Sequence, residues 1–249
     1  MTMHRIFRRS IFWLVPLILL PMAVLLVLQY RFLRSLENAT ASAERNHLRN
    51  SLEAVTEQIE STYRLRAEHA LTMSEVRLKD VGHLGEHFRN TCVPGARTFF
   101  AIRYKGQMSE WGVFDSKGHE REPMMEEGEA IKMATVSWQV AHKREHLLST
   151  PSLSVDERDP HHRVIMRPVV DDSLHVVGVV GVVLDEVASK NAMMNIGAKA
   201  LKRRYRGLDL ALKIGDRFPP MPRGREFVTQ PMGFIFTNWR AGLRDVCMG

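Results

Sequence analysis

Several polar and aromatic residues lie in segments of the sequence that are otherwise apolar. Arg103 and Tyr104 end the run RTFFAIRY, Trp111 follows in EWGVFD, and Arg167 interrupts RVIMRPVV. A small-ligand pocket needs fixed polar groups and an aromatic wall within an apolar cup, and an arginine can hold a carboxylate through two parallel hydrogen bonds. A strand arginine is also explained, and more often, as a surface residue. The candidate ligand-binding residues are therefore Arg103, Tyr104, Trp111, Arg167 and Asp185.

Two further groups of acidic and histidine side chains suggest chemistry only weakly. Residues 156–162 (DERDPHH) collect types that bind metals, but adjacent side chains of an extended segment point apart, so a solvated loop is favoured over a metal site. Asp115 and Asp185 could form an acid–base pair, yet each stands where a turn or a helix cap favours an aspartate. We therefore expect no metal site and no catalytic residue.

Enzyme motifs give no support for catalysis. The sequence has no Walker loop, no GxSxG elbow and no HExxH pair, and we expect no cofactor. Its two cysteines, Cys92 and Cys247, form no CxxC pair. Cys92 follows the predicted stalk while Cys247 is expected nearer the membrane, so two free or buried thiols are favoured over a disulfide.

The net charge of +7 fits a surface over anionic lipid as well as it fits a nucleic-acid-binding protein. The densest basic cluster lies on a predicted helix, where a solvated face is the favoured explanation. It contains Lys199, Lys202, Arg203, Arg204 and Arg206. We expect membrane lipid as a partner and no nucleic acid.

Residues 11–30 (IFWLVPLILLPMAVLLVLQY) contain no formally charged side chain. Twenty residues at about 1.5 Å each cross the hydrocarbon layer of a bilayer. A cleaved signal peptide is the alternative, because Ala-x-Ala sites end at Ala41 and Ala43, but the apolar run is longer than a signal peptide needs. We expect an uncleaved anchor in the cytoplasmic (inner) membrane, with residues 1–10 as a basic cytoplasmic tail and the bulk periplasmic or extracellular.

Residues 31–90 are predicted to form a helical stalk. Proline is absent from about residue 39 to residue 88, and apolar residues recur at helical spacing. They are Leu48, Leu52, Val55, Ile59, Tyr63, Ala67 and Ala70. A helix of this length predicts that its first half pairs with a second copy, giving a homodimer, and that its second half packs on the following domain. A helix folded back as a hairpin is the alternative.

Residues 91–249 alternate between strand-like and helix-like segments. Strands are expected at 97–104, 110–115, 163–170, 175–184 and 208–214, with more strand material in 227–239. Helices are expected at 126–146 and 186–205. Turn residues follow several of these segments, and a proline-rich loop spans 218–222. The strand at 175–184 is apolar almost throughout, so both of its faces should be covered.

This order of elements, and the stretch RPVVDDSLHVVGVVGVVLDEVASKN above all, resembles the extracytoplasmic PAS-like sensor fold called the Cache domain. The resemblance implies an α+β fold: a transmembrane helix and long helical stalk leading into a PAS-like antiparallel sheet with flanking helices. It also implies a small-ligand sensor of a membrane receptor, most commonly a two-component sensor histidine kinase. No kinase or other output motif occurs in these residues, so we expect the sensing portion of such a receptor. The alternative is a membrane-anchored, non-catalytic binding or assembly protein, and an anchored hydrolase is disfavoured.

Overall fold

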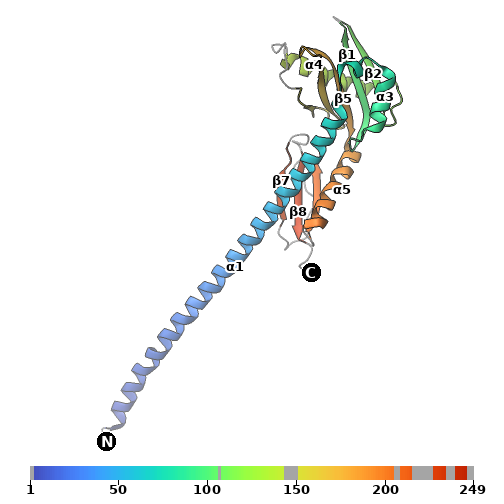
Figure 1. The fold of residues 1–249 in the computed structure, drawn as a ribbon. Helices are drawn as coiled ribbons and strands as arrows, with labels where there is room; N and C mark the ends of the chain where they lie inside the picture. The colour runs from blue at the N-terminus through green and yellow to red at the C-terminus, as the bar shows by residue number, and fades with distance from the viewer. Residues whose placement is uncertain are drawn as a thin grey trace. The chain divides into compact units, whose positions relative to one another are not determined.

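The computed structural model describes residues 3–105, 108–142, 151–204, 208–214, 227–233 and 239–245. The chain divides into two compact units, residues 1–50 and 51–249. The predicted fold class is confirmed: the protein is α+β, with a long N-terminal apolar helix and an antiparallel sheet with flanking helices (Figure 1). The predicted boundaries at residues 30 and 90 stay predictions.

Helix α1 (Met3–Leu71) carries the predicted membrane segment. Among the described residues, it is the one helix long and apolar enough to cross a membrane. The large apolar side chains from Leu19 to Leu28 all lie exposed, including Val24, Leu25 and Leu28 at 50% or more. A helix that is apolar on every side needs an apolar surrounding, so this stretch is suited to lipid. Helix α1 is continuous over Met3–Leu71, so no hairpin interrupts the stalk over these residues.

Within the second unit, α1 buries the predicted apolar stripe. Leu52, Val55, Ile59, Tyr63, Ala67 and Ala70 are all at most 2% exposed. Their spacing of three and four residues places them on one side of the helix, and the opposite side carries exposed residues such as Glu57 and Leu65. The prediction that this half of the stalk packs on the domain is confirmed.

The stalk predicted for residues 31–90 is not one continuous helix. Helix α1 ends at Leu71 and is followed by the short α2 (Glu75–Leu78) and by α3 (Val81–Asn90). Asp80 starts α3 because its carboxylate accepts hydrogen bonds from the backbone N–H groups of Gly82 and His83, at 3.0 and 3.3 Å. An aspartate N-cap satisfies N–H groups that a new helix leaves unpaired.

The larger sheet contains β1 (Ala96–Lys105), β2 (Met108–Asp115), β3 (Ser154–Asp156), β4 (His162–Val170) and β5 (Val176–Asp185). The described strands are ordered β2-β1-β5-β4-β3, and each neighbouring pair is antiparallel. Strand β5 is central, and Gly178 through Leu184 are buried, which confirms that both of its faces are covered. Strand β3 was not predicted.

Helices cover both faces of this sheet, with α3 and α4 (Met125–His142) on opposite sides (Figure 1). The α4 face contains a core cluster that includes Phe100, Ile102, Met166 and Trp138. On the other face, Phe88 of α3 stacks on Phe99, with ring centroids 4.9 Å apart. The predicted continuation of α4 to residue 146 lies outside the described residues.

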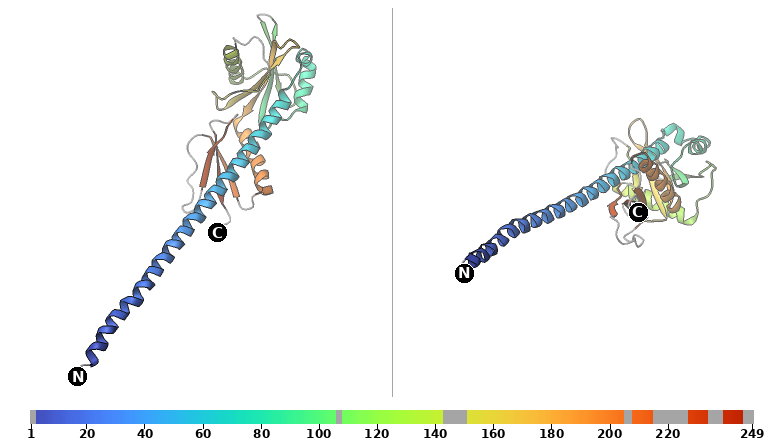
Figure 2. Two further views of the ribbon diagram at one scale, coloured as in Figure 1. Left: turned by 60° about the vertical axis from the view of Figure 1, so that its left-hand side comes forward. Right: turned by 90° about the horizontal axis from the view of Figure 1, so that it is seen from below.

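Helix α5 (Glu186–Arg204) follows β5 without a loop and leads to a second sheet (Figure 2). In the described residues this sheet has the order β6-β8-β7, formed by β6 (Leu208–Ile214), β7 (Phe227–Pro231) and β8 (Trp239–Asp245). The strand material expected at 227–239 is therefore two separate strands, and the second begins only at Trp239. The sequence did not predict that these strands leave the larger sheet.

Smaller expectations have mixed outcomes. Lys199 and Lys202 are exposed on α5, as predicted for a solvated face, whereas the side chains of Arg203, Arg204 and Arg206 lie outside the described part. Cys92 is free and exposed. The expectation for Cys247 and the proline-rich loop predicted at 218–222 lie outside the described residues.

Candidate functional site

An open pocket of about 290 Å³ lies between α4 and the edge of the sheet formed by β3 and β4. It is lined by Glu126, Glu129, Ala130, Met133, Asp156, Arg158, Asp159, His162 and Val164. Helix α4 gives one wall, and the segment from β3 to β4 gives the other. The lining therefore combines a small apolar floor with charged groups at the rim.

The charge of this acidic pocket is strongly negative. Four carboxylates face one guanidinium, which leaves three formal negative charges when His162 is neutral. Arg158 is itself engaged: its Nε lies 3.0 Å from both carboxylate oxygens of Asp156, and its Nη2 donates to the Met133 carbonyl at 2.7 Å. The remaining carboxylates favour a positively charged group in the hollow.

The two aspartates of the pocket are held in their ionised form. Burial alone would raise the pKa of Asp156, but the hydrogen bonds from Arg158 outweigh burial and hold the pKa below its ordinary value. Burial would also raise the pKa of Asp159, but hydrogen bonds from the His162 ring and the His161 backbone outweigh burial and lower the pKa. Hydrogen bonding to the charged form is the cause in both cases.

His162 lies at the base of the pocket with its side chain only 9% exposed. Its Nδ1 is 2.8 Å from the Asp159 carboxylate, and because a carboxylate only accepts, Nδ1 carries the proton. The Nε2 atom then faces the Glu126 carboxylate at 3.8 Å. His162 therefore lies between the carboxylates of Asp159 and Glu126.

A buried ion cluster fixes the start of α4 beside the pocket. Glu127, whose side chain is fully buried, accepts hydrogen bonds from Arg121 at 2.7 Å and Thr98 at 2.9 Å, and Arg97 lies 3.1 Å away. Burial would raise the pKa of Glu127, but these donors outweigh burial and lower it. The cluster ties α4 to β1, so Glu126 and Glu129 are presented from a fixed helix.

The five residues predicted to bind ligand are not brought together. Directly paired residues of neighbouring strands share a face of the sheet. Trp111 pairs with Ile102 and so lies with Tyr104 on the α4 face, whereas Arg103 lies on the opposite face with its partner Glu110. None of the five lines the acidic pocket.

Each predicted residue has a local role in the structure. Arg103 pairs with Glu110 and donates to the Lys79 carbonyl at 3.2 Å, and Arg167 donates to the Thr72 hydroxyl at 2.7 Å. Trp111 is 41% exposed. The Tyr104 hydroxyl is close to Gln139, and burial raises the pKa of this tyrosine.

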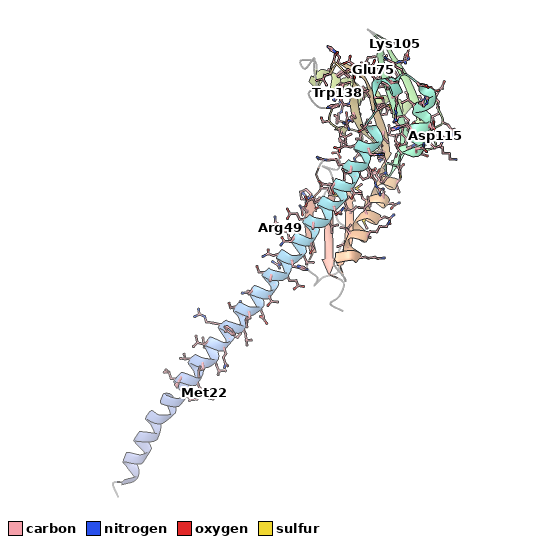
Figure 3. The ribbon with its side chains drawn as sticks, viewed as in Figure 1. Met22, Arg49, Glu75, Lys105, Asp115 and Trp138 are labelled. Atoms are coloured by element: carbon pink, nitrogen blue, oxygen red, sulfur yellow. The ribbon has the colours of Figure 1, made fainter. Side chains whose placement is uncertain are left out.

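The two aspartates considered as an acid–base pair serve as caps. Asp185 accepts from the Ala188 backbone N–H at 2.8 Å at the start of α5, and Asp115 accepts from the N–H groups of Lys117 and His119. The cap and turn interpretation is confirmed for both. Lys105 and Asp115 mark opposite ends of the β1–β2 ribbon (Figure 3).

The pocket was not predicted, because the pattern of residues 156–162 favours a solvated loop. In the structure this segment forms a wall of the pocket with Asp156, Arg158, Asp159 and His162. The signal in the sequence was three carboxylates and two histidines within seven residues, of which Asp156, Asp159 and His162 line the pocket. Their partners on α4 are about thirty positions away in the chain, so spacing alone did not reveal them.

A second hollow, of about 570 Å³, lies among the end of α1, α2 and α3. His69, His83 and His87 contribute to it, together with Arg77 and Glu86. Over the described positions, no cluster of three or more His, Cys, Asp or Glu residues has a geometry that could hold a metal ion.

Comparisons with known proteins identify no family. No protein-family model and no curated protein matches the chain. The periplasmic sensory domain of the Campylobacter jejuni chemoreceptor Tlp1 aligns with a TM-score of 0.37 and 10% identity, over 84% of this chain and 90% of that chain. A methyl-accepting chemotaxis protein X aligns with a TM-score of 0.33 and 12% identity, over 83% and 95%. These similarities are too low to identify a function.

Proposed function

We propose that this chain is the extracytoplasmic sensing portion of a membrane receptor, and that it binds a small cationic ligand in the acidic pocket. The observation that carries the proposal is the pocket itself, in which Glu126, Glu129, Asp156 and Asp159 surround a small apolar floor. An apolar helix long enough to cross a membrane supports the anchored location. An organic amine satisfies both the charge and the floor of such a site.

We also propose that the receptor acts as a homodimer through its stalk and signals as a two-component sensor histidine kinase. Exposed apolar side chains at helical spacing, Phe32, Leu33 and Leu36 on α1, support helix pairing. The kinase output rests on the Cache resemblance of residues 167–191 alone.

Calorimetric titration of the full chain in lipid nanodiscs tests the ligand class. Putrescine, a diamine, is the probe, and succinate, a dicarboxylate of similar length, is its matched control. We expect binding of putrescine and none of succinate. Asp159→Asn should weaken putrescine binding about tenfold, because a lost charge-assisted hydrogen bond is worth about 1.4 kcal/mol or more. Asp172→Asn, in an exposed turn outside the pocket, should leave the affinity unchanged.

Equal binding of succinate, no binding of putrescine, or an unchanged affinity in Asp159→Asn would each contradict a cationic ligand in this pocket. The same titration addresses the alternative of a membrane-anchored assembly protein. That alternative is favoured by one observation, the exposed apolar side chains of Met125, Met133, Val136 and Val140 on α4. An assembly protein would bind neither small molecule.

A further inference from the structure

The segment that forms the wall of the acidic pocket also contacts the first turn of α5. His161 Nδ1 lies 2.9 Å from the carboxylate of Glu186, the first residue of α5. The neighbouring His162, at the base of the pocket, is the strand partner of Asp185. Consecutive residues of one segment therefore touch the pocket and the start of a helix that leads out of the sheet.

The start of α5 is rigidly attached to the sheet. Asp185 is the last residue of β5, caps α5 through the Ala188 N–H at 2.8 Å, and donates its own backbone N–H to the Gly95 carbonyl at 2.9 Å. Because no loop separates β5 from α5, a shift at the end of the strand moves the first turn of the helix.

Gly95 forms the next contact in this series. Its φ of +79° lies in the region that favours glycine. A Cβ built at Gly95 would lie 2.3 Å from the Ser189 hydroxyl oxygen and 2.6 Å from the Ser189 Cα. The turn before β1 therefore packs directly on the backbone of α5, where a side chain has no room.

Tyr63 of α1 also contacts the turn before β1. Its side chain is fully buried, and its hydroxyl donates to the carbonyl of Pro94, the residue before Gly95. Burial raises the pKa of Tyr63 far above its ordinary value, against the effect of the adjacent Ser189 side chain. Tyr63, Pro94, Gly95 and Ser189 thus form one junction between α1, the start of β1 and α5.

Further along, α5 stays in contact with α1. A Cβ at Gly197 would lie 3.1 Å from Ile59 Cδ1 and 2.3 Å from Leu210 Cδ2 of β6. In addition, the Gly233 backbone N–H donates to Glu60 at 2.5 Å. A change at the start of α5 can therefore reach both α1 and the second sheet through packed contacts.

We propose that the junction of Tyr63, Pro94, Gly95 and Ser189 is a relay that couples the acidic pocket to α1, with the His161–Glu186 contact and the Asp185 cap as its input. The direction of the signal, from ligand to α1, rests on the proposed function. The coupling itself does not require a ligand, because energetic coupling between two sites is reciprocal.

Hydrogen exchange of the full chain in nanodiscs tests the relay in both directions. Glu186→Gln removes the carboxylate that contacts His161 and should speed exchange of residues 59–67 in α1 roughly threefold, since local opening follows the contacts that hold a segment. Tyr63→Phe should in turn speed exchange of residues 156–162 at the pocket. Ser189→Ala is the second variant should Tyr63→Phe fail to fold.

Glu110→Gln is the matched control, because it also removes an ion-paired carboxylate but lies on β2, away from α5. It should leave both segments unchanged. Exchange in 59–67 that is the same in Glu186→Gln as in the native chain, or equally raised in Glu110→Gln, would overturn the relay.

A putrescine arm separates this inference from the proposed function. Putrescine binding without any change in the exchange of 59–67 would contradict the relay and leave the cationic site standing. If Glu186→Gln and Tyr63→Phe change hydrogen exchange as expected but putrescine does not bind, the ligand class is contradicted and the relay still holds.

Discussion

Glu127 is a single buried charge that holds α4, one wall of the acidic pocket, in position. Its carboxylate is fully buried, with Arg97, Arg121 and Thr98 around it. Paired charges of this kind need not increase stability over an apolar core, but removing one partner leaves the others buried and uncompensated. Removing Glu127 should therefore change the position of α4 and, with it, one side of the pocket.

This cluster should make stability depend on acidic pH. The pKa of Glu127 is lower in the folded protein than its ordinary value of about 4.3. The stabilisation is therefore fully present above that value and is lost as the pH falls through the folded pKa. Glu127→Gln should lower the free energy of unfolding by about 3 kcal/mol at pH 7 and flatten its dependence below pH 5.

Urea unfolding measured from pH 3 to pH 7 checks this prediction. Glu122→Gln, at an exposed position nearby, is the control and should keep both the stability and the pH dependence. A Glu127→Gln protein as stable as the native chain at pH 7 would show that the cluster does not hold α4.

At the scale of elements, α3 is held on the sheet by aromatic packing. Phe88 is fully buried, stacks on Phe99 and lies with its ring centroid 5.3 Å from that of Phe114. Phe88→Ala should cost about 3–5 kcal/mol in the free energy of unfolding, because it removes the ring and leaves a cavity. Val76→Ala, at a residue of α2 that is 78% exposed, should change it by less than about 0.5 kcal/mol. Thermal and urea unfolding measure both, and similar effects of the two substitutions would contradict this packing.

The sequence predicted the elements that have a regular pattern. The stripe from Leu52 to Ala70 and the apolar β5 follow directly from helical and strand periodicity, and both are buried as expected. The break after Leu71 was missed because Thr72, Met73 and Ser74 include neither proline nor glycine. The cap at Asp80, which starts α3, is a local signal that the sequence does contain.

The candidate site was harder to predict than the fold. Arg103 and Arg167 are charges in apolar strands, and in the structure each reaches a polar partner in the short segments that connect α1, α2 and α3. The acidic pocket instead arises where α4 approaches a loop distant in the chain. The contact between these two segments depends on tertiary packing, so the pattern of either segment alone does not predict it.

For the molecule as a whole, the proposed sensing role depends on where the membrane lies. The apolar side chains exposed from Leu19 to Leu28 are suited to a bilayer, and the sensing role requires residues 51–249 to lie outside the cytoplasm. Cys92, which is free and exposed, offers a natural reporter of that location. With Cys247→Ser in place, it becomes the single cysteine of the chain.

Labelling of Cys92 in intact spheroplasts with a membrane-impermeant maleimide tests this claim most directly, with a Ser10→Cys variant that lacks both native cysteines as the cytoplasmic control. We predict that Cys92 reacts in the intact cells and that position 10 reacts only after lysis. Labelling of Cys92 only after lysis, or its recovery in a soluble fraction free of membrane, would contradict an anchored sensor outside the cytoplasm.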